Sequence, residues 1–141
     1  MTVSIRTYEP ADETQVIALW QDAGLTRPWN DPHKDIARAR AVWPDLLLVA
    51  EDDQEVIGSV MAGYDGHRGW LYYLAAARHR RGEGIGRGLV AEAEARLEAL
   101  GCPKVMLMVR AENHAVLDYY DALGYHREGT LIAGRRLIPD D

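Results

Sequence analysis

The stretch Arg80-Arg81-Gly82-Glu83-Gly84-Ile85-Gly86-Arg87-Gly88 decides how this chain folds and what it can hold. It places four glycines and three arginines directly before a long amphipathic segment. Glycine lets a backbone turn tightly and approach a ligand closely. The start of a helix adds free amide N–H groups and the positive end of the helix dipole. The pattern therefore predicts a loop that cradles the phosphates of a ligand, and the alternative is a flexible turn exposed to solvent.

Two common phosphate-binding loops do not fit this stretch. A P-loop ends in Gly-Lys-Ser/Thr, and this chain has no such sequence. The dinucleotide pattern G-x-G-x-x-G fails in both registers, because its last glycine falls on Leu89 when counted from Gly84 and on Arg87 when counted from Gly82. A third kind of phosphate-binding loop is therefore needed.

Apolar periodicity and turn residues divide the rest of the chain into strands and helices. Strands are expected at 3–8, 46–50, 56–61, 70–76 and 105–109, with one or two more at 131–138. Helices are expected at 10–23, 32–43, 85–100 and 113–123. Antiparallel strands thus lead into one strand-helix-strand crossover. This order predicts an α/β (α+β) fold in which a single domain, 1–141, has a mixed central sheet of six to seven strands with about four helices on both faces.

Composition narrows the possible partners and compartments. The formal charge of −6 and the pI of about 5.3 argue against non-specific binding to nucleic acid or to an anionic membrane. Cys102 is the only cysteine, which excludes an intrachain disulfide and suits a reducing cytoplasm. The histidines show no metal-ligand spacing with one another or with Cys102. We therefore expect a cytoplasmic protein with no metal and no membrane-spanning segment.

Two motifs carry a resemblance to a known family. The pattern Arg81-x-x-Gly84-x-Gly86, preceded by Tyr73-Leu74-Ala75-Ala76, resembles the acetyl-CoA loop of the GNAT (Gcn5-related) N-acetyltransferases. The segment Asn113–Tyr125, with its paired tyrosines and Leu-Gly-Tyr ending, resembles the family's other signature. The order of elements agrees as well, so the resemblance covers essentially the whole chain. The strings at 27–32, 63–69 and 101–104 resemble a bacterial subgroup called YpeA-like.

The resemblance implies a co-substrate, a site and a reaction. Acetyl-CoA is expected to enter between splayed strands 70–76 and 105–109, and an amine bound beside it to attack the acetyl group directly. Tyr120 is expected to protonate the departing thiolate. The coenzyme-binding residues implied are Leu74, Ala75, Ala76, Arg81, Gly82, Glu83, Gly84, Ile85, Gly86, Arg87 and Asn113.

Structural roles compete with these assignments. Asn113 and Tyr120 are seven residues apart and share a helix face. A phenol titrates near ~10, close enough to a thiol for proton transfer. Tyr120 nevertheless also fits an apolar face with Val116 and Leu123, as a core residue would, and Asn113 fits a helix cap.

The acceptor side is less defined. Peptide-terminal acetyltransferases of the ribosomal-protein type often place a Glu twelve residues before the tyrosine acid, where this chain has Met108. The candidate bases are Asp65, His67, Glu51 and Tyr72 acting through water, although the first two also fit a turn. The expected acceptor pocket is lined by Arg27, Trp29, Asn30, Asp31, Arg135 and Arg136. Asn30 and Asp31 equally suit the cap of the following helix.

Several functions stay open from the sequence. The first is an N-acetyltransferase acting on a small amine or on a protein or peptide amine. The second is a non-catalytic acyl-CoA-binding or sensing module, which keeps the loop without needing Tyr120. An antibiotic-modifying enzyme is compatible with the acidic charge, which disfavours a tRNA-directed toxin. Cys102 lies away from the expected site with no activating histidine, which argues against a cysteine nucleophile. A homodimer is expected.

Overall fold

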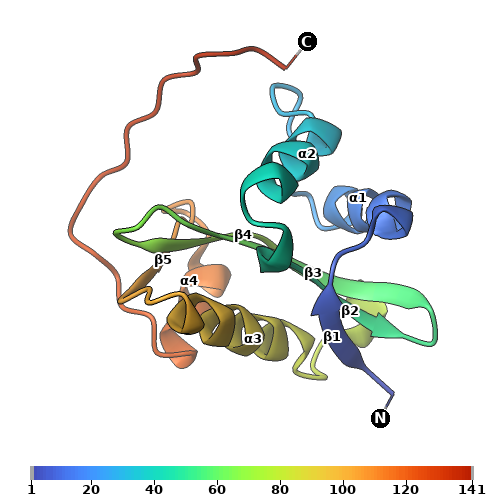
Figure 1. The fold of residues 1–141 in the computed structure, drawn as a ribbon. Helices are drawn as coiled ribbons and strands as arrows, with labels where there is room; N and C mark the ends of the chain where they lie inside the picture. The colour runs from blue at the N-terminus through green and yellow to red at the C-terminus, as the bar shows by residue number, and fades with distance from the viewer. Residues whose placement is uncertain (1, 141) are drawn as a thin grey trace.

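A mixed five-stranded sheet organises the chain in the computed structural model, which describes residues 2–140. The sheet order follows the chain order, β1-β2-β3-β4-β5 (Figure 1). Neighbouring strands are antiparallel except for β4 and β5, which are parallel. The strands are β1 (Ser4–Thr7), β2 (Leu47–Asp52), β3 (Glu55–Tyr64), β4 (Gly69–Ala76) and β5 (Val105–Leu107). The predicted mixed sheet with one crossover is therefore confirmed.

Helices cover both faces of this sheet, as the sequence predicted (Figure 1). The pair α1 (Glu13–Asp22) and α2 (Pro32–Val42) lies on one face, and α3 (Ile85–Ala99) and α4 (His114–Ala122) lie on the other. Short 3-10 turns are η1 (Pro10–Asp12), η2 (Pro44–Leu46) and η3 (Arg78–Arg80). Within residues 2–140 none of the helices has both the length and the apolar composition needed to cross a bilayer.

The core forms between α3 and the middle of the sheet. Leu89, Ala93 and Leu97 recur every four residues along α3 and are fully buried. The central strands β2 and β3 are buried on both faces, which explains their continuous apolar runs. Gly58 of β3 lies directly under α3, because a Cβ placed there would be 2.7 Å from Cγ2 of Ile85. The absence of a side chain at this position allows the helix to approach the strand.

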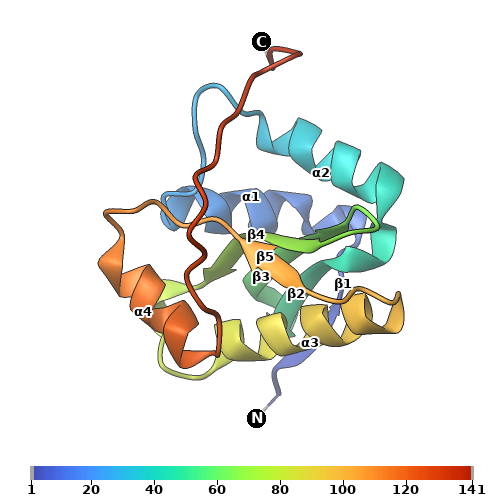
Figure 2. The same ribbon diagram turned by 90° about the vertical axis from the view of Figure 1, so that its left-hand side faces the viewer.

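The expectation of six to seven strands was wrong, because residues 125–140 contain no strand. This segment leaves α4, arches outside the body and returns toward α2 (Figures 1 and 2). The sheet edge closest in sequence is β5, which is only three residues long. At the other end, the carboxylate of Asp140 accepts hydrogen bonds from the backbone N–H of Asp31 and from the guanidinium of Arg38, both at 2.8 Å. The tail is thus anchored to α2 and not paired with the sheet.

The close packing at Gly58 predicts a position-specific loss of stability. Gly58→Ala adds a methyl group against Ile85 and Leu89, and overpacking of this kind costs about 1–3 kcal/mol. Gly63→Ala is the matched control on the same strand, because nothing lies within 4 Å of a Cβ placed there. Urea denaturation with an unchanged m-value should show the loss for Gly58→Ala alone. Equal midpoints for the two variants would contradict this packing.

Candidate active site

The parallel pair β4 and β5 separates after three residues. Residues 69–71 of β4 pair with residues 105–107 of β5, and β4 then continues to Ala76 without a partner on that side. Within residues 2–140 the β4 edge from Tyr72 onward therefore presents backbone N–H and C=O groups that no strand occupies. Such an edge can pair with an extended ligand as it would with another strand.

A β-bulge interrupts the pairing of β4 with β3. It lies at the point along β4 where β5 separates from the opposite edge. Along β3 the paired positions advance by two residues, from Ser59 to Met61, while along β4 they advance by three, from Ala75 to Tyr72. The additional residue lets Tyr73 adopt a φ of 53°, in the left-handed region. A non-glycine residue there costs about 1–2 kcal/mol. The bulge thus redirects the strand just before Leu74, the residue at which the groove begins.

A groove of about 440 Å³ lies where the end of β4, the glycine loop and α4 meet. Its lining residues are Leu74, Ala75, Ala76, Arg80, Arg81, Gly82, Gly84, Ile85, Gly86, Arg87, Val116, Tyr119 and Tyr120. The fold therefore brings together Tyr120 and every predicted coenzyme-binding residue except Glu83 and Asn113. Arg80, one of the three arginines of the predicted phosphate-binding loop, lines the groove as well. Val116 and Tyr119 were not predicted to line it, although their proximity to Tyr120 on one helix was a usable signal.

The glycine loop leaves the start of α3 open to a ligand. Gly82 and Gly84 have φ values of 85° and 80°, which L side chains rarely adopt. Gly84 occupies the N-cap position of α3 and supplies no side-chain cap. By contrast, α2 and α4 are capped by the side chains of Asp31 and Asn113. The first amides of α3 thus lack a capping side chain and are suited to bind an anion.

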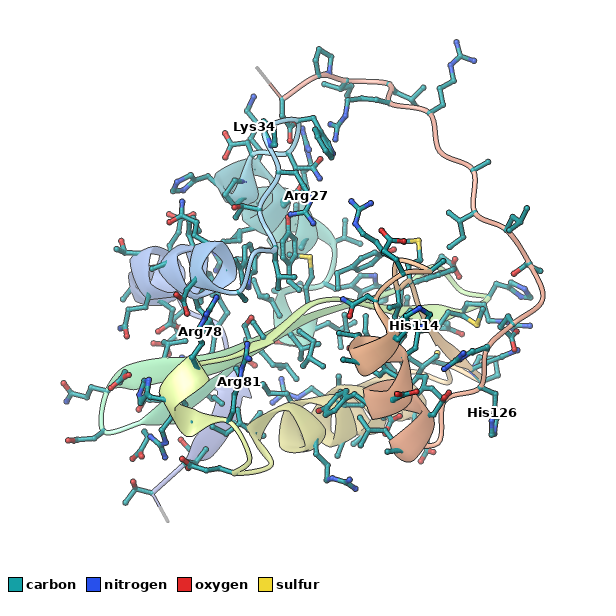
Figure 3. The ribbon with its side chains drawn as sticks, turned by 180° about the vertical axis from the view of Figure 1, so that it is seen from behind. Arg27, Lys34, Arg78, Arg81, His114 and His126 are labelled. Carbon is teal, nitrogen blue, oxygen red and sulfur yellow. The ribbon has the colours of Figure 1, made fainter. Side chains whose placement is uncertain are left out.

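Positive charge reinforces this site. Within residues 2–140, Arg81 and Arg87 form no ion pair, and both line the groove. Figure 3 views the molecule from the side that shows Arg81 beside the glycine loop and His114 at the start of α4. Arg80 differs, because its guanidinium lies 2.9 Å from carboxylate oxygens of both Asp52 and Glu83. Two unpaired cations thus face the groove in a chain of net charge −6.

This arrangement agrees with the sequence comparisons. Residues 14–125 match the acetyltransferase (GNAT) family.

The chain belongs to the GNAT family.

Relatives of known name and structure support this assignment. An acetyltransferase of Sodalis glossinidius is 48% identical over 139 residues, covering 98% of each chain. The NatC complex bound to Gag peptide and CoA contains a chain that is 26% identical, with a TM-score of 0.76, over 91% of this chain and 87% of that one. The fold also matches AAC(6')-Iy in complex with a CoA-containing bisubstrate analogue, with 18% identity, a TM-score of 0.79, and 98% and 100% coverage. The protein is therefore an acyltransferase; its YpeA-like subgroup stays a prediction.

Tyr120 lies in the groove of this GNAT enzyme with its hydroxyl free. Its ring packs edge-on against Tyr119 and Tyr125, with centroids 5.3 and 5.7 Å away. Within residues 2–140 its hydroxyl makes no hydrogen bond, whereas that of Tyr125 donates to Glu94 at 2.7 Å. Burial, with a smaller contribution from Tyr119, raises the pKa of Tyr120 to about 12. The phenol is therefore protonated at neutral pH and available to a ligand.

The two other predicted coenzyme contacts have structural partners. The side chain of Asn113 accepts a hydrogen bond from the backbone N–H of Val116 at 3.4 Å and so caps α4. The carboxylate of Glu83 forms an ion pair with Arg80 at 2.9 Å, so that the charge of Arg80 is neutralised beside the loop. Both residues lie next to the groove in sequence but outside its lining.

The candidate bases of the GNAT enzyme are dispersed. The carboxylate of Asp65 accepts backbone N–H groups of Arg68 and His67, which lowers its pKa and identifies it as a turn former. Glu51 is paired with Arg6 at 2.6 Å. Tyr72 is 40% exposed and immediately follows the last residue of β4 that pairs with β5. Of the four candidates, Tyr72 is thus the one at the point where the strands separate.

A second cavity includes Trp29, Arg135 and Arg136 of the predicted acceptor residues, whereas Arg27, Asn30 and Asp31 lie outside its lining. Its volume is about 650 Å³, and it lies between Trp29, Arg38 and residues 134–138 of the tail, which include Arg135 and Arg136. Asn30 accepts a hydrogen bond from Arg136, while Asp31 caps α2 through the N–H of His33. Arg27 donates to the carbonyl groups of Gly24 and Thr26. No residue is shared with the groove.

The raised pKa of Tyr120 is directly measurable. Burial disfavours the phenolate, so the ¹³Cζ resonance of Tyr120 should keep its protonated position past pH 10 and move with a midpoint of about 12. Labelled tyrosine and the Tyr120→Phe variant assign the signal. A midpoint at the ordinary value near ~10 would show that the ring is solvated.

Proposed function

We propose that this GNAT enzyme is an N-acetyltransferase that moves an acetyl group from acetyl-CoA to a primary amine of a small molecule, peptide or protein. The observation that carries the proposal is the continuity of the groove. The uncapped start of α3 and the free guanidinium groups of Arg81 and Arg87 lie at one end, and the unpaired edge of β4 runs from the other. A ligand with a polyanionic head and a long amide-bearing arm matches both parts.

The coenzyme's pyrophosphate accepts hydrogen bonds from the amides of the glycine loop and from Arg81 and Arg87. Each such charge-assisted bond contributes about 1.5–3 kcal/mol. The pantetheine amides pair with the free edge of β4 from Leu74 to Ala76, in the manner of an added strand. This pairing brings the thioester toward the bulge at Tyr73.

In the reaction, the amine nitrogen attacks the acetyl carbonyl carbon, a C–N bond forms and the C–S bond breaks. A backbone N–H beside the bulge stabilises the negative charge that develops on the carbonyl oxygen, a contribution of about 2.7–4 kcal/mol in comparable sites. Tyr120 donates its proton to the departing sulfur. The amine loses its own proton to water held by Tyr72, since the other candidate bases are engaged elsewhere or lie at the β3–β4 turn.

The loop residues should control coenzyme affinity. Arg81→Glu replaces an unpaired groove cation by an anion and should weaken acetyl-CoA binding by at least about tenfold in calorimetry. Arg68→Glu makes the same charge change at the opposite end of β4 and is the matched control. Similar affinities for the two variants, or no binding by the parent protein, would remove the coenzyme from this groove.

The phenol of Tyr120 should control turnover. Tyr120→Phe should lower kcat by about 10²–10⁴ while leaving the Kd for acetyl-CoA within about threefold. Tyr125→Phe removes a neighbouring hydroxyl outside the groove lining and should retain activity. Thiol release with a panel of amines (a peptide α-amine, a lysine peptide, a polyamine and an aminoglycoside) reports the rate. Undiminished turnover in Tyr120→Phe would show that this ring is only part of the core.

A further inference from the structure

Tyr73, the residue at the centre of the β4 bulge, is held in place by a buried chain of hydrogen bonds. The indole N–H of Trp20 donates to Oγ of Ser59 at 2.8 Å, and the hydroxyl of Ser59 donates to the carbonyl oxygen of Tyr73 at 2.9 Å. Trp20 and Ser59 are completely buried. Residues from α1 and β3 thus fix the backbone of the bulge in a region without solvent.

The side chain of Tyr73 is fixed as well. Its ring stacks on that of Trp20, with centroids 3.8 Å apart and planes 10° from parallel. Its hydroxyl donates to Oδ2 of Asp35 on α2 at 2.6 Å. The carbonyl, the ring and the hydroxyl of one strained residue are therefore each contacted by a different element.

Ser59 is the point on which this arrangement depends. Its hydroxyl both accepts from Trp20 and donates to Tyr73, so its removal leaves two buried polar groups without partners. If Tyr73 relaxed to an extended conformation, the register of β4 would slip by one residue. Such a slip moves each following side chain to the opposite face of the sheet. The groove positions of Leu74, Ala75 and Ala76 thus rest on the bulge.

We propose that Ser59, oriented by Trp20, is a positioning residue that holds the Tyr73 bulge so that the backbone N–H groups following it face the acyl carbonyl of a bound thioester. This role rests on the proposed function. Ser59 itself lies outside the groove lining and acts through the backbone of Tyr73. The glycine loop, which binds the phosphates, does not depend on it.

The contribution of Ser59 to binding of the acyl carbonyl can be measured by comparing acetyl-CoA with CoA, because only acetyl-CoA carries that carbonyl. In Ser59→Ala the ratio of the two dissociation constants, Kd(acetyl-CoA)/Kd(CoA), should rise about three- to tenfold, the equivalent of one hydrogen bond. The affinity for CoA, which shares the pantetheine and phosphate contacts but lacks the acyl carbonyl, should fall by less than that for acetyl-CoA. If Ser59 contributed only to the stability of the fold, Ser59→Ala would weaken the binding of both ligands equally and leave the ratio of dissociation constants unchanged.

Three variants complete the experiment. Ser59→Thr keeps the hydroxyl and should retain the parent ratio. Ser59→Cys is nearly isosteric with a weak donor and should reproduce the shift if Ser59→Ala does not fold. Leu97→Ala empties a buried position at the opposite end of β4, beside Gly69, and should lower the melting temperature without changing the ratio.

The outcomes separate the two claims. A ratio that is unchanged in Ser59→Ala, with both ligands bound, overturns the role of Ser59 and leaves the proposed function intact. If the parent protein binds neither ligand, the proposed function fails and the positioning role fails with it. Faster amide hydrogen exchange at Leu74 and Ala75 in Ser59→Ala, absent in Leu97→Ala, is the expected independent sign that the bulge has loosened.

Discussion

The site depends on how β4 is held: one edge pairs with β3 along most of its length, while the other is released by β5 after Leu71. A parallel strand that paired throughout would fill the space in which the groove opens. The bulge at Tyr73 redirects β4 at this point, and the contacts of Ser59 and Trp20 offset the cost of its left-handed backbone. Binding surface and core packing are therefore parts of one arrangement.

Electrostatics adds selectivity to this geometry. A chain with a net charge of −6 repels polyanions over most of its surface, so a local concentration of amide N–H groups and guanidinium groups is needed to attract one. Arg81 and Arg87 supply free charge, whereas Arg80 is neutralised by Asp52 and Glu83. The loop thus presents a limited positive field at the start of α3, where the helix dipole has the same sign.

The helices on the two faces of the sheet make different contributions to the site. On one face, α3 and α4 enclose the groove, with Tyr119 over Gly86 and Tyr120 inside the lining. On the other, α1 and α2 contact the bulge through Trp20 and Asp35, and the tail is anchored to α2 through Asp140. The elements that hold the bulge and the element that anchors the tail therefore lie on the same face of the sheet.

The sequence by itself determined the helices, the mixed sheet, the family and most of the groove lining, because glycines and helix periodicity act locally along the chain. The sequence-based expectation failed for the tail, where one or two strands were predicted at 131–138. In the structure, Asp140 is anchored to α2 and the neighbouring edge strand β5 is only three residues long. The sequence also showed no sign of the Trp20–Ser59–Tyr73 chain, whose members are 39 and 14 residues apart. Only the tertiary structure decided these features. A buried hydrogen bond between residues far apart in the sequence forms only when packing brings their elements together, and the same packing decides whether a segment pairs with a sheet edge.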